Sequence, residues 1–173
     1  MDIALLSKDT LKIKIKKISV IVDPSKETPK TDADAIIVLS ENPDKSRVNE
    51  YRVAINGAGE YEVGGLKISA FRATTDLIFS FSLENCEAIL VKASSLSKIS
   101  TDKIKDYSIV VVNADSEINQ SVITSMEPRI IIIYGQKAVE AAKALGKENL
   151  VKSSKISINE DKLPEETEIY LLS

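Results

Sequence analysis

The sequence predicts a layered α+β fold with two β-sheets and helices packed on the outside. Its first half is a series of strand patterns, and its second half alternates strands with short helices. Elements in this order are typical of sheets that pack face to face and carry helices on their outer faces. With 173 residues, 43% of them hydrophobic, the chain suffices for one well-packed domain and is short for two. We therefore expect residues 1–173 to form a single domain.

Strand patterns fill the first half. Residues 11–16 alternate apolar side chains with lysines, and residues 18–22 are a short β-branched run, so the two predict a hairpin. The continuous apolar run at 35–39 is typical of a strand buried on both faces. Four of the six glycines lie within residues 57–65, which indicates tight turns there. Further strands are predicted at residues 52–55, 66–71, 77–83 and 88–92.

The second half adds two helices. Residues 116–126 have the apolar spacing of a helix that Asp115 or Ser116 would cap. Residues 136–145 predict an alanine-rich helix that Gly146 would end. Strands are predicted around them at residues 109–112, 130–134, 155–158 and 168–172.

The composition excludes several classes of function. There is no histidine, so the usual zinc ligand and the usual general base near neutral pH are both missing. The one cysteine, Cys86, sits in a predicted hairpin turn and excludes an internal disulfide. A net charge of -3 gives no reason to expect nucleic-acid binding. Without a signal peptide or a membrane-spanning run, we expect a soluble, cytoplasmic protein.

Several segments, in order along the chain, carry a resemblance to a known family. They are Val22-Asp23-Pro24, Asp32-Ala33-Asp34-Ala35, Gly59-Glu60-Tyr61-Glu62-Val63-Gly64-Gly65, Glu127-Pro128-Arg129-Ile130 and Leu163-Pro164-Glu165-Glu166-Thr167-Glu168. The series resembles a branch of the metallo-β-lactamase superfamily, the predicted zinc-dependent hydrolases related to the ascorbate-6-phosphate lactonase group. The resemblance implies a four-layer αββα sandwich, with the segment from Gly59 to Gly65 as a structural turn near its rim.

The same resemblance locates the family's metal site, and this sequence departs from it throughout. The family's H-x-H-x-D-H motif follows the strand at residues 35–39, where Ser40, Asn42 and Lys45 stand for the histidines and Asp44 alone is kept. The family's last histidine falls at or near Gly135. Its two remaining ligand segments correspond to residues 6–8 and 91–96, which also lack ligands. We therefore expect no bound zinc, no metal-ligand residues and no catalytic residues.

Three hypotheses for the function follow. The leading one is a non-catalytic protein with this fold that acts by binding or assembly, with an unknown partner. The second is a metal-dependent hydrolase with a reduced oxygen-ligand site, in which Asp44 would hold Mg²⁺ or Ca²⁺ together with Asp23 and Glu41. The third is a structural subunit of a homo-oligomer or of a complex with an active relative. Asp44 has a simpler interpretation as a turn residue or a helix cap.

Two further groups could carry acid–base or nucleophilic chemistry. Glu60 and Glu62 lie two residues apart, on one face if their segment is extended. Ser94, Ser95 and Ser97 could supply a nucleophile, with Lys92 or Lys98 as the nearby base. We interpret the glutamates as part of the structural turn, and the serines as a loop that leads into a short helix.

Overall fold

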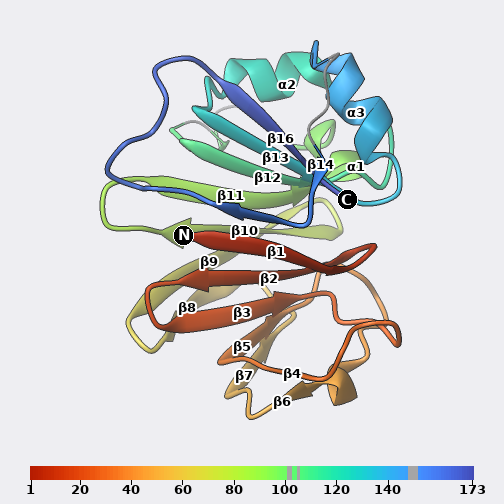
Figure 1. Ribbon diagram of the computed structural model, residues 1–173, viewed down its shortest axis with the longest axis vertical. Coiled ribbons are helices and arrows are strands. Elements are labelled where there is room, and N and C mark those ends of the chain that lie inside the picture. The colour runs from red at the N-terminus through yellow and green to blue at the C-terminus, as the bar shows by residue number, and fades with distance from the viewer. Residues whose placement is uncertain (101–102, 105, 148–151) are drawn as a thin grey trace.

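Two β-sheets pack face to face in the computed structural model, which describes residues 1–100, 103–104, 106–147 and 152–173 (Figure 1). The six-stranded sheet has the order β15 (Lys155–Ser157), β1 (Asp2–Ser7), β2 (Thr10–Ile15), β3 (Ile18–Val22), β5 (Ala35–Ile37) and β7 (Val53–Ile55). The eight-stranded sheet has the order β14 (Lys152–Ser153), β16 (Glu168–Leu172), β13 (Ile130–Tyr134), β12 (Ile109–Asn113), β11 (Glu87–Lys92), β10 (Asp76–Ser82), β9 (Leu66–Ala73) and β8 (Gly59–Val63).

Short helices and a small sheet complete the layers. Helices α1 (Ala93–Leu96), α2 (Gln120–Ser125) and α3 (Ala138–Ala144) lie beside the eight-stranded sheet, whereas the two-stranded sheet of β4 (Thr31–Asp32) and β6 (Val48–Asn49) and the 3-10 turn η1 (Lys45–Arg47) lie beside the other (Figure 1). The α+β sandwich predicted from the sequence is confirmed. On the outer face of the six-stranded sheet, the described residues form short strands and one 3-10 turn instead of an α-helix. Residues 40–47 are polar and include Pro43, a composition typical of a loop.

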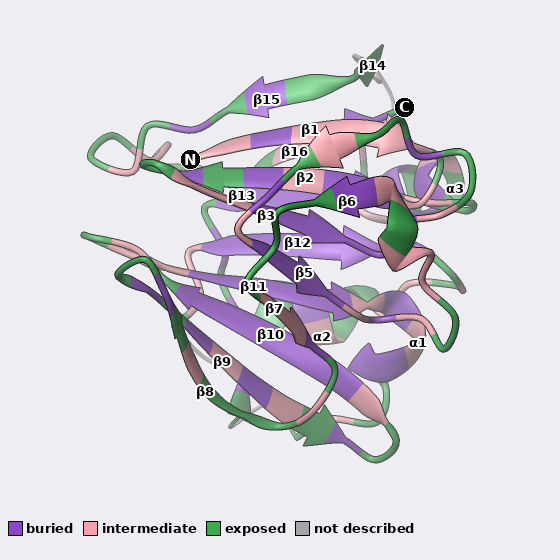
Figure 2. Ribbon diagram, turned by 90° about the horizontal axis from the view of Figure 1, so that it is seen from below, coloured by how far each residue is buried: buried purple, intermediate pink, exposed green. Residues whose placement is uncertain are grey.

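Three apolar clusters hold the layers together. The largest lies between the two sheets and includes Ile13, Phe79 and Ile132, all fully buried. A second packs the eight-stranded sheet against the helices, and a small third one lies outside the six-stranded sheet around Ile21 and Ile36. Figure 2 shows the buried strands running through both sheets. The burial of apolar side chains on both faces explains why β12 and β13 are nearly unbroken Val and Ile runs.

The sandwich has two rims that differ in chemistry. Strands β11, β12 and β13 are parallel, as are β3 and β5, so their carboxyl ends meet at one rim. We call this the motif rim because the segments that the resemblance equates with the family's metal site lie there. The opposite rim, the turn rim, contains the β2–β3, β8–β9 and β10–β11 turns.

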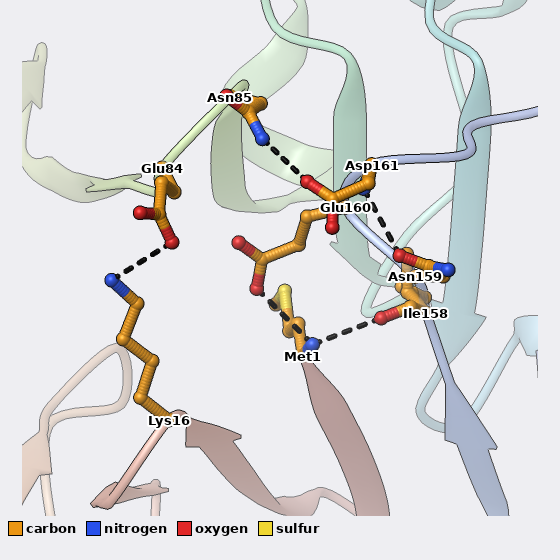
Figure 3. Close-up of polar contacts among 8 residues, drawn as sticks. All are labelled: Met1, Lys16, Glu84, Asn85, Ile158, Asn159, Glu160 and Asp161. Carbon is orange, nitrogen blue, oxygen red and sulfur yellow. Dashed lines mark hydrogen bonds and ion pairs between the residues drawn. The ribbon is translucent and has the colours of Figure 1, made fainter.

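Polar contacts between distant segments close part of the turn rim (Figure 3). Lys16 Nζ lies 3.1 Å from Glu84 Oε2 and so joins the two sheets. The Met1 ammonium group lies 3.1 Å from Glu160 Oε1 and donates to the Ile158 carbonyl oxygen at 2.9 Å.

Most predicted strands are present, but some local predictions were wrong. Helix α2 begins at Gln120 rather than at residue 116, and Asn119 caps it by accepting from the Val122 N–H. The segment from Gly59 to Val63 is not a turn but the edge strand β8, and the turn follows at Gly64 and Gly65. Alternation of apolar Tyr61 and Val63 with exposed glutamates is the strand signal that the glycines obscured.

None of the helices in the described part of the chain has the length and apolar run that crossing a bilayer requires.

Candidate functional site

The motif rim gathers polar residues from several segments of the chain. Asn113 and Tyr134 are the last residues of β12 and β13, and Lys92 is the last residue of β11. Asp23 follows β3 on the facing sheet, and Asp9 lies in the β1–β2 turn. The carboxyl ends of parallel strands are where open α/β sheets place their ligands, so this is the candidate site.

Asp23 anchors the loop that corresponds to the family's metal-binding motif. Its carboxylate is buried, and Oδ1 accepts from the Leu39 N–H at 2.7 Å and from the Ser40 N–H at 2.9 Å. Burial raises the pKa of Asp23 above its ordinary value, although the two N–H groups and the charge of Lys92 oppose that rise. The backbone there is left-handed, at φ 46°, and Thr10 donates to the Asp23 carbonyl oxygen at 2.7 Å.

Asp44, which the resemblance equates with the aspartate of the family's metal motif, accepts hydrogen bonds within its own loop. Its Oδ1 accepts from the Ser46 hydroxyl at 2.6 Å and from the Ser46 N–H at 3.2 Å, which caps η1. Arg47, at the end of η1, donates from Nε to the Thr28 carbonyl oxygen at 2.7 Å. The simpler of the two interpretations, a helix cap, therefore describes Asp44.

Gly135, at or near the position that the resemblance equates with the family's last histidine, is closely packed. Gly135 follows β13 with φ 100°, which favours glycine. A Cβ atom there would lie 2.6 Å from Asn113 Oδ1, 3.2 Å from the Ala114 backbone nitrogen and 3.4 Å from Asp9 Oδ1. A side chain at position 135 would therefore require the Asn113 side chain to move.

Tyr134 lies beneath this contact and is completely buried. Burial raises the pKa of its phenol well above 10, and the nearby charges of Asp23, Asp9 and Asp115 add to the rise. The Asn113 amide opposes the rise, although the hydroxyl makes no hydrogen bond of good geometry within the described residues. Tyr134 is therefore a neutral phenol out of reach of a substrate.

The serines near the end of β11 form the helical turn α1 rather than a loop that leads into a helix. Ser94 donates from its hydroxyl to Asp115 Oδ2 at 2.6 Å and from its N–H to Asp115 Oδ1 at 3.0 Å. Asp115 was one of the two residues expected to cap a helix at 116–126, but it binds α1 instead. Ser95 is fully buried.

Lys98 forms an ion pair with Asp76 rather than pairing with a serine. Its Nζ lies 3.2 Å from Asp76 Oδ2. Burial would raise the pKa of Asp76, but the hydrogen bond and the positive charge of Lys98 outweigh that effect and lower the pKa below its ordinary value. An ammonium group in this ion pair is a poor general base for a serine.

The remaining motif residues have structural positions. Glu60 lies on the edge strand β8, and its carboxylate accepts from the Ser69 hydroxyl at 2.5 Å. Strands β9 and β10 separate β8 from β11, the nearest strand of the motif rim in that sheet. Arg129 donates to the Glu165 carbonyl oxygen, and the Thr167 hydroxyl donates to the Pro128 carbonyl oxygen at 2.6 Å. The two motif segments around Pro128 and Glu165 are therefore bound to each other.

The residues of the motif rim do not fit the two-metal centre that the fold family implies. Across the described ranges, no three His, Cys, Asp or Glu side chains are grouped so that they could hold an ion. The carboxylates of Asp23 and Asp44 are engaged by backbone N–H groups. Glu41 is exposed, and the structure does not group it with these two aspartates around a common point.

Sequence reasoning missed Asn113, Tyr134 and Asp9. A signal was available for the first two, because each is a polar residue that ends an otherwise apolar strand run. Nothing in the sequence near Asp9 indicates that its carboxylate reaches the other sheet.

Comparison with known proteins supports the architecture. No family model and no curated protein matches the chain. Among solved structures, a Thermotoga maritima protein assigned to the zinc-dependent hydrolases of the metallo-β-lactamase superfamily superposes with a TM-score of 0.77 at 16% identity, over 99% of this chain and 97% of that one. This chain has the metallo-β-lactamase fold.

Two further structures agree. Isothiocyanate hydrolase from Delia radicum gut bacteria has a TM-score of 0.60 at 11% identity, over 92% of this chain and 100% of that one. The metallo-β-lactamase fold protein YhfI from Bacillus subtilis has a TM-score of 0.59 at 7% identity, over 98% and 95%. At such low identities the likeness concerns the fold alone.

Crowding at Gly135 can be tested with a matched pair of substitutions. Gly135→Ala and Gly65→Ala both place a side chain at a positive φ, 100° and 87°, but a Cβ at Gly65 meets nothing within 4 Å. We expect Gly135→Ala to lower the free energy of unfolding by roughly 3 kcal/mol and Gly65→Ala by roughly 1 kcal/mol, in urea denaturation. Equal losses would show that position 135 is not crowded.

The raised pKa of Asp23 makes stability depend on pH. The native state holds the Asp23 proton more tightly than the unfolded state, whose pKa is near 3.8, so this group's contribution falls as pH rises through the native pKa. Asp23→Asn lacks this fall. Its free energy of unfolding, relative to the unsubstituted protein, should increase between about pH 3 and pH 7 in urea denaturation. A difference that decreases or stays constant would contradict the raised pKa.

Proposed function

We propose that this chain is a non-catalytic protein with the metallo-β-lactamase fold, one that has lost the metal site and acts by binding or assembly. The observation that carries the proposal is the contact of Gly135 with Asn113. A substitution that only removed a ligand would leave a space at position 135. Here the Asn113 side chain occupies that space, which supports a rim whose residues pack against one another instead of holding a metal ion.

The charges at the rim support the same proposal. Lys92 places an ammonium group close enough to Asp23 and Asp76 to act on both pKa values. A fixed cation among carboxylates reduces their attraction for a metal ion. The carboxylates themselves are engaged by N–H and hydroxyl groups, so binding a metal would break existing hydrogen bonds.

The exposed side chains of the described residues support a binding protein rather than an obligate subunit of an assembly. Obligate subunit interfaces are large and apolar, like a domain core cut in half. Among the described residues, Tyr51 is the most exposed large hydrophobic residue, at 36%. This surface suits a polar or small-molecule partner better than a permanent subunit contact.

The proposal predicts that hydrolysis is absent even with metal supplied. We expect the untagged protein, with Zn²⁺ or Mn²⁺ added, to hydrolyse a lactone and an isothiocyanate no faster than a metal-only blank. Asp44→Ala should give the same rates, and Glu27→Ala provides a control for an acidic residue on an exposed turn. Turnover above the blank that is lost in Asp44→Ala and kept in Glu27→Ala would contradict the proposal and support a hydrolase with an oxygen-ligand metal site.

A further inference from the structure

A second concave feature lies at the turn rim, on the opposite side of the molecule from the motif rim. It is a groove of about 620 Å³ between the two sheets. One wall is the β2–β3 turn of the six-stranded sheet, and the other combines the β8–β9 and β10–β11 turns of the eight-stranded sheet. This volume lies within the range of roughly 300–1,000 Å³ that is usual for small-molecule sites.

The floor of the groove is apolar because the ends of core strands form it. Ile15 and Leu66 are buried members of the inter-sheet core, and Ile18 and Leu83 pack against that core from its edge. The mouth stays open at Gly65, where no atom lies within 4 Å of the place that a Cβ would take. At Gly64 the chain lies close to Ile18, since a Cβ there would lie 2.3 Å from Ile18 Cδ1.

The mouth of the groove is cationic, although the whole chain carries a net charge of -3. Lys16, Lys17 and Lys67 line it, against one acidic residue, Glu84. The ion pair between Lys16 and Glu84 has both side chains about two-thirds exposed, so it contributes little and opens at low cost. Lys67 also faces Glu62 across the β8–β9 pair, whereas Lys17 has no acidic partner among the described residues.

We propose that this groove binds a single-chain anionic amphiphile, a long-chain carboxylate, with its tail on the apolar floor and its carboxylate at the lysines. An apolar floor alone would accept any chain, and the lysine mouth selects the anionic head group. The site lies away from the motif rim, so the inference does not depend on the function proposed above.

The first experiment is a titration of ¹⁵N-labelled protein with decanoate below its micelle concentration, followed by amide chemical shifts. We expect saturable shifts at Gly64, Gly65 and Leu83. From octanoate to decanoate the affinity should rise about twofold to fourfold for each added methylene, because each one buries apolar surface. Decyltrimethylammonium, with the same chain and the opposite charge, should bind at least about tenfold more weakly.

Charge reversal tests the role of the lysines without touching the floor. Lys17→Glu combined with Lys67→Glu should weaken decanoate binding about tenfold or more. Lys26→Glu combined with Lys30→Glu makes the same change of net charge at exposed positions outside the groove, and should leave the affinity within about twofold. Absence of saturable shifts, equal binding of the cationic analogue, no dependence on chain length, or equal losses in both double variants would each overturn the proposal.

Discussion

The arrangement of the motif rim depends on one contact, in which the Asn113 side chain at the end of β12 fills the space beside Gly135 at the end of β13. The parallel pairing of these strands sets Asn113 directly across from Tyr134, so the residue after Tyr134 must pass close to Asn113. A left-handed glycine allows that approach. The Ala114 N–H donates to the Tyr134 carbonyl oxygen at 2.7 Å, which holds the two strand ends together. The crowding at position 135 follows from this contact.

The facing sheet completes the rim through Asp23. A buried carboxylate is costly unless hydrogen bonds satisfy it, and here the N–H groups of Leu39 and Ser40 do so. The first residues of the loop after β5 are therefore held through their backbone N–H groups. Ser40, Asn42 and Lys45, which the resemblance equates with the family's histidines, lie in this loop.

Most strands could be predicted from the sequence, because their alternating or continuous apolar runs reflect burial on one or two faces. It also predicted the end of α3 at Gly146, which has a φ of 84°. It failed where side-chain hydrogen bonds decide the structure: Asp115 binds α1 instead of capping α2, and Asn119 takes that role. The positions expected for a metal site could be located only through resemblance, because a chain without histidine has no local pattern that marks them. The Gly135 contact could not be predicted, because it joins residues whose approach depends on strand register.

We propose that the motif rim holds no metal, and the metal content of untagged protein tests this directly. The protein would be dialysed against excess Zn²⁺, Mn²⁺ and Mg²⁺, exchanged into metal-free buffer and analysed by elemental mass spectrometry; a histidine tag must be avoided because it binds zinc. We expect well below about 0.1 equivalent of each metal, since the described residues assemble no ligand set that could retain one. Retention of one equivalent, lost in Asp44→Ala or Asp23→Asn, would contradict it.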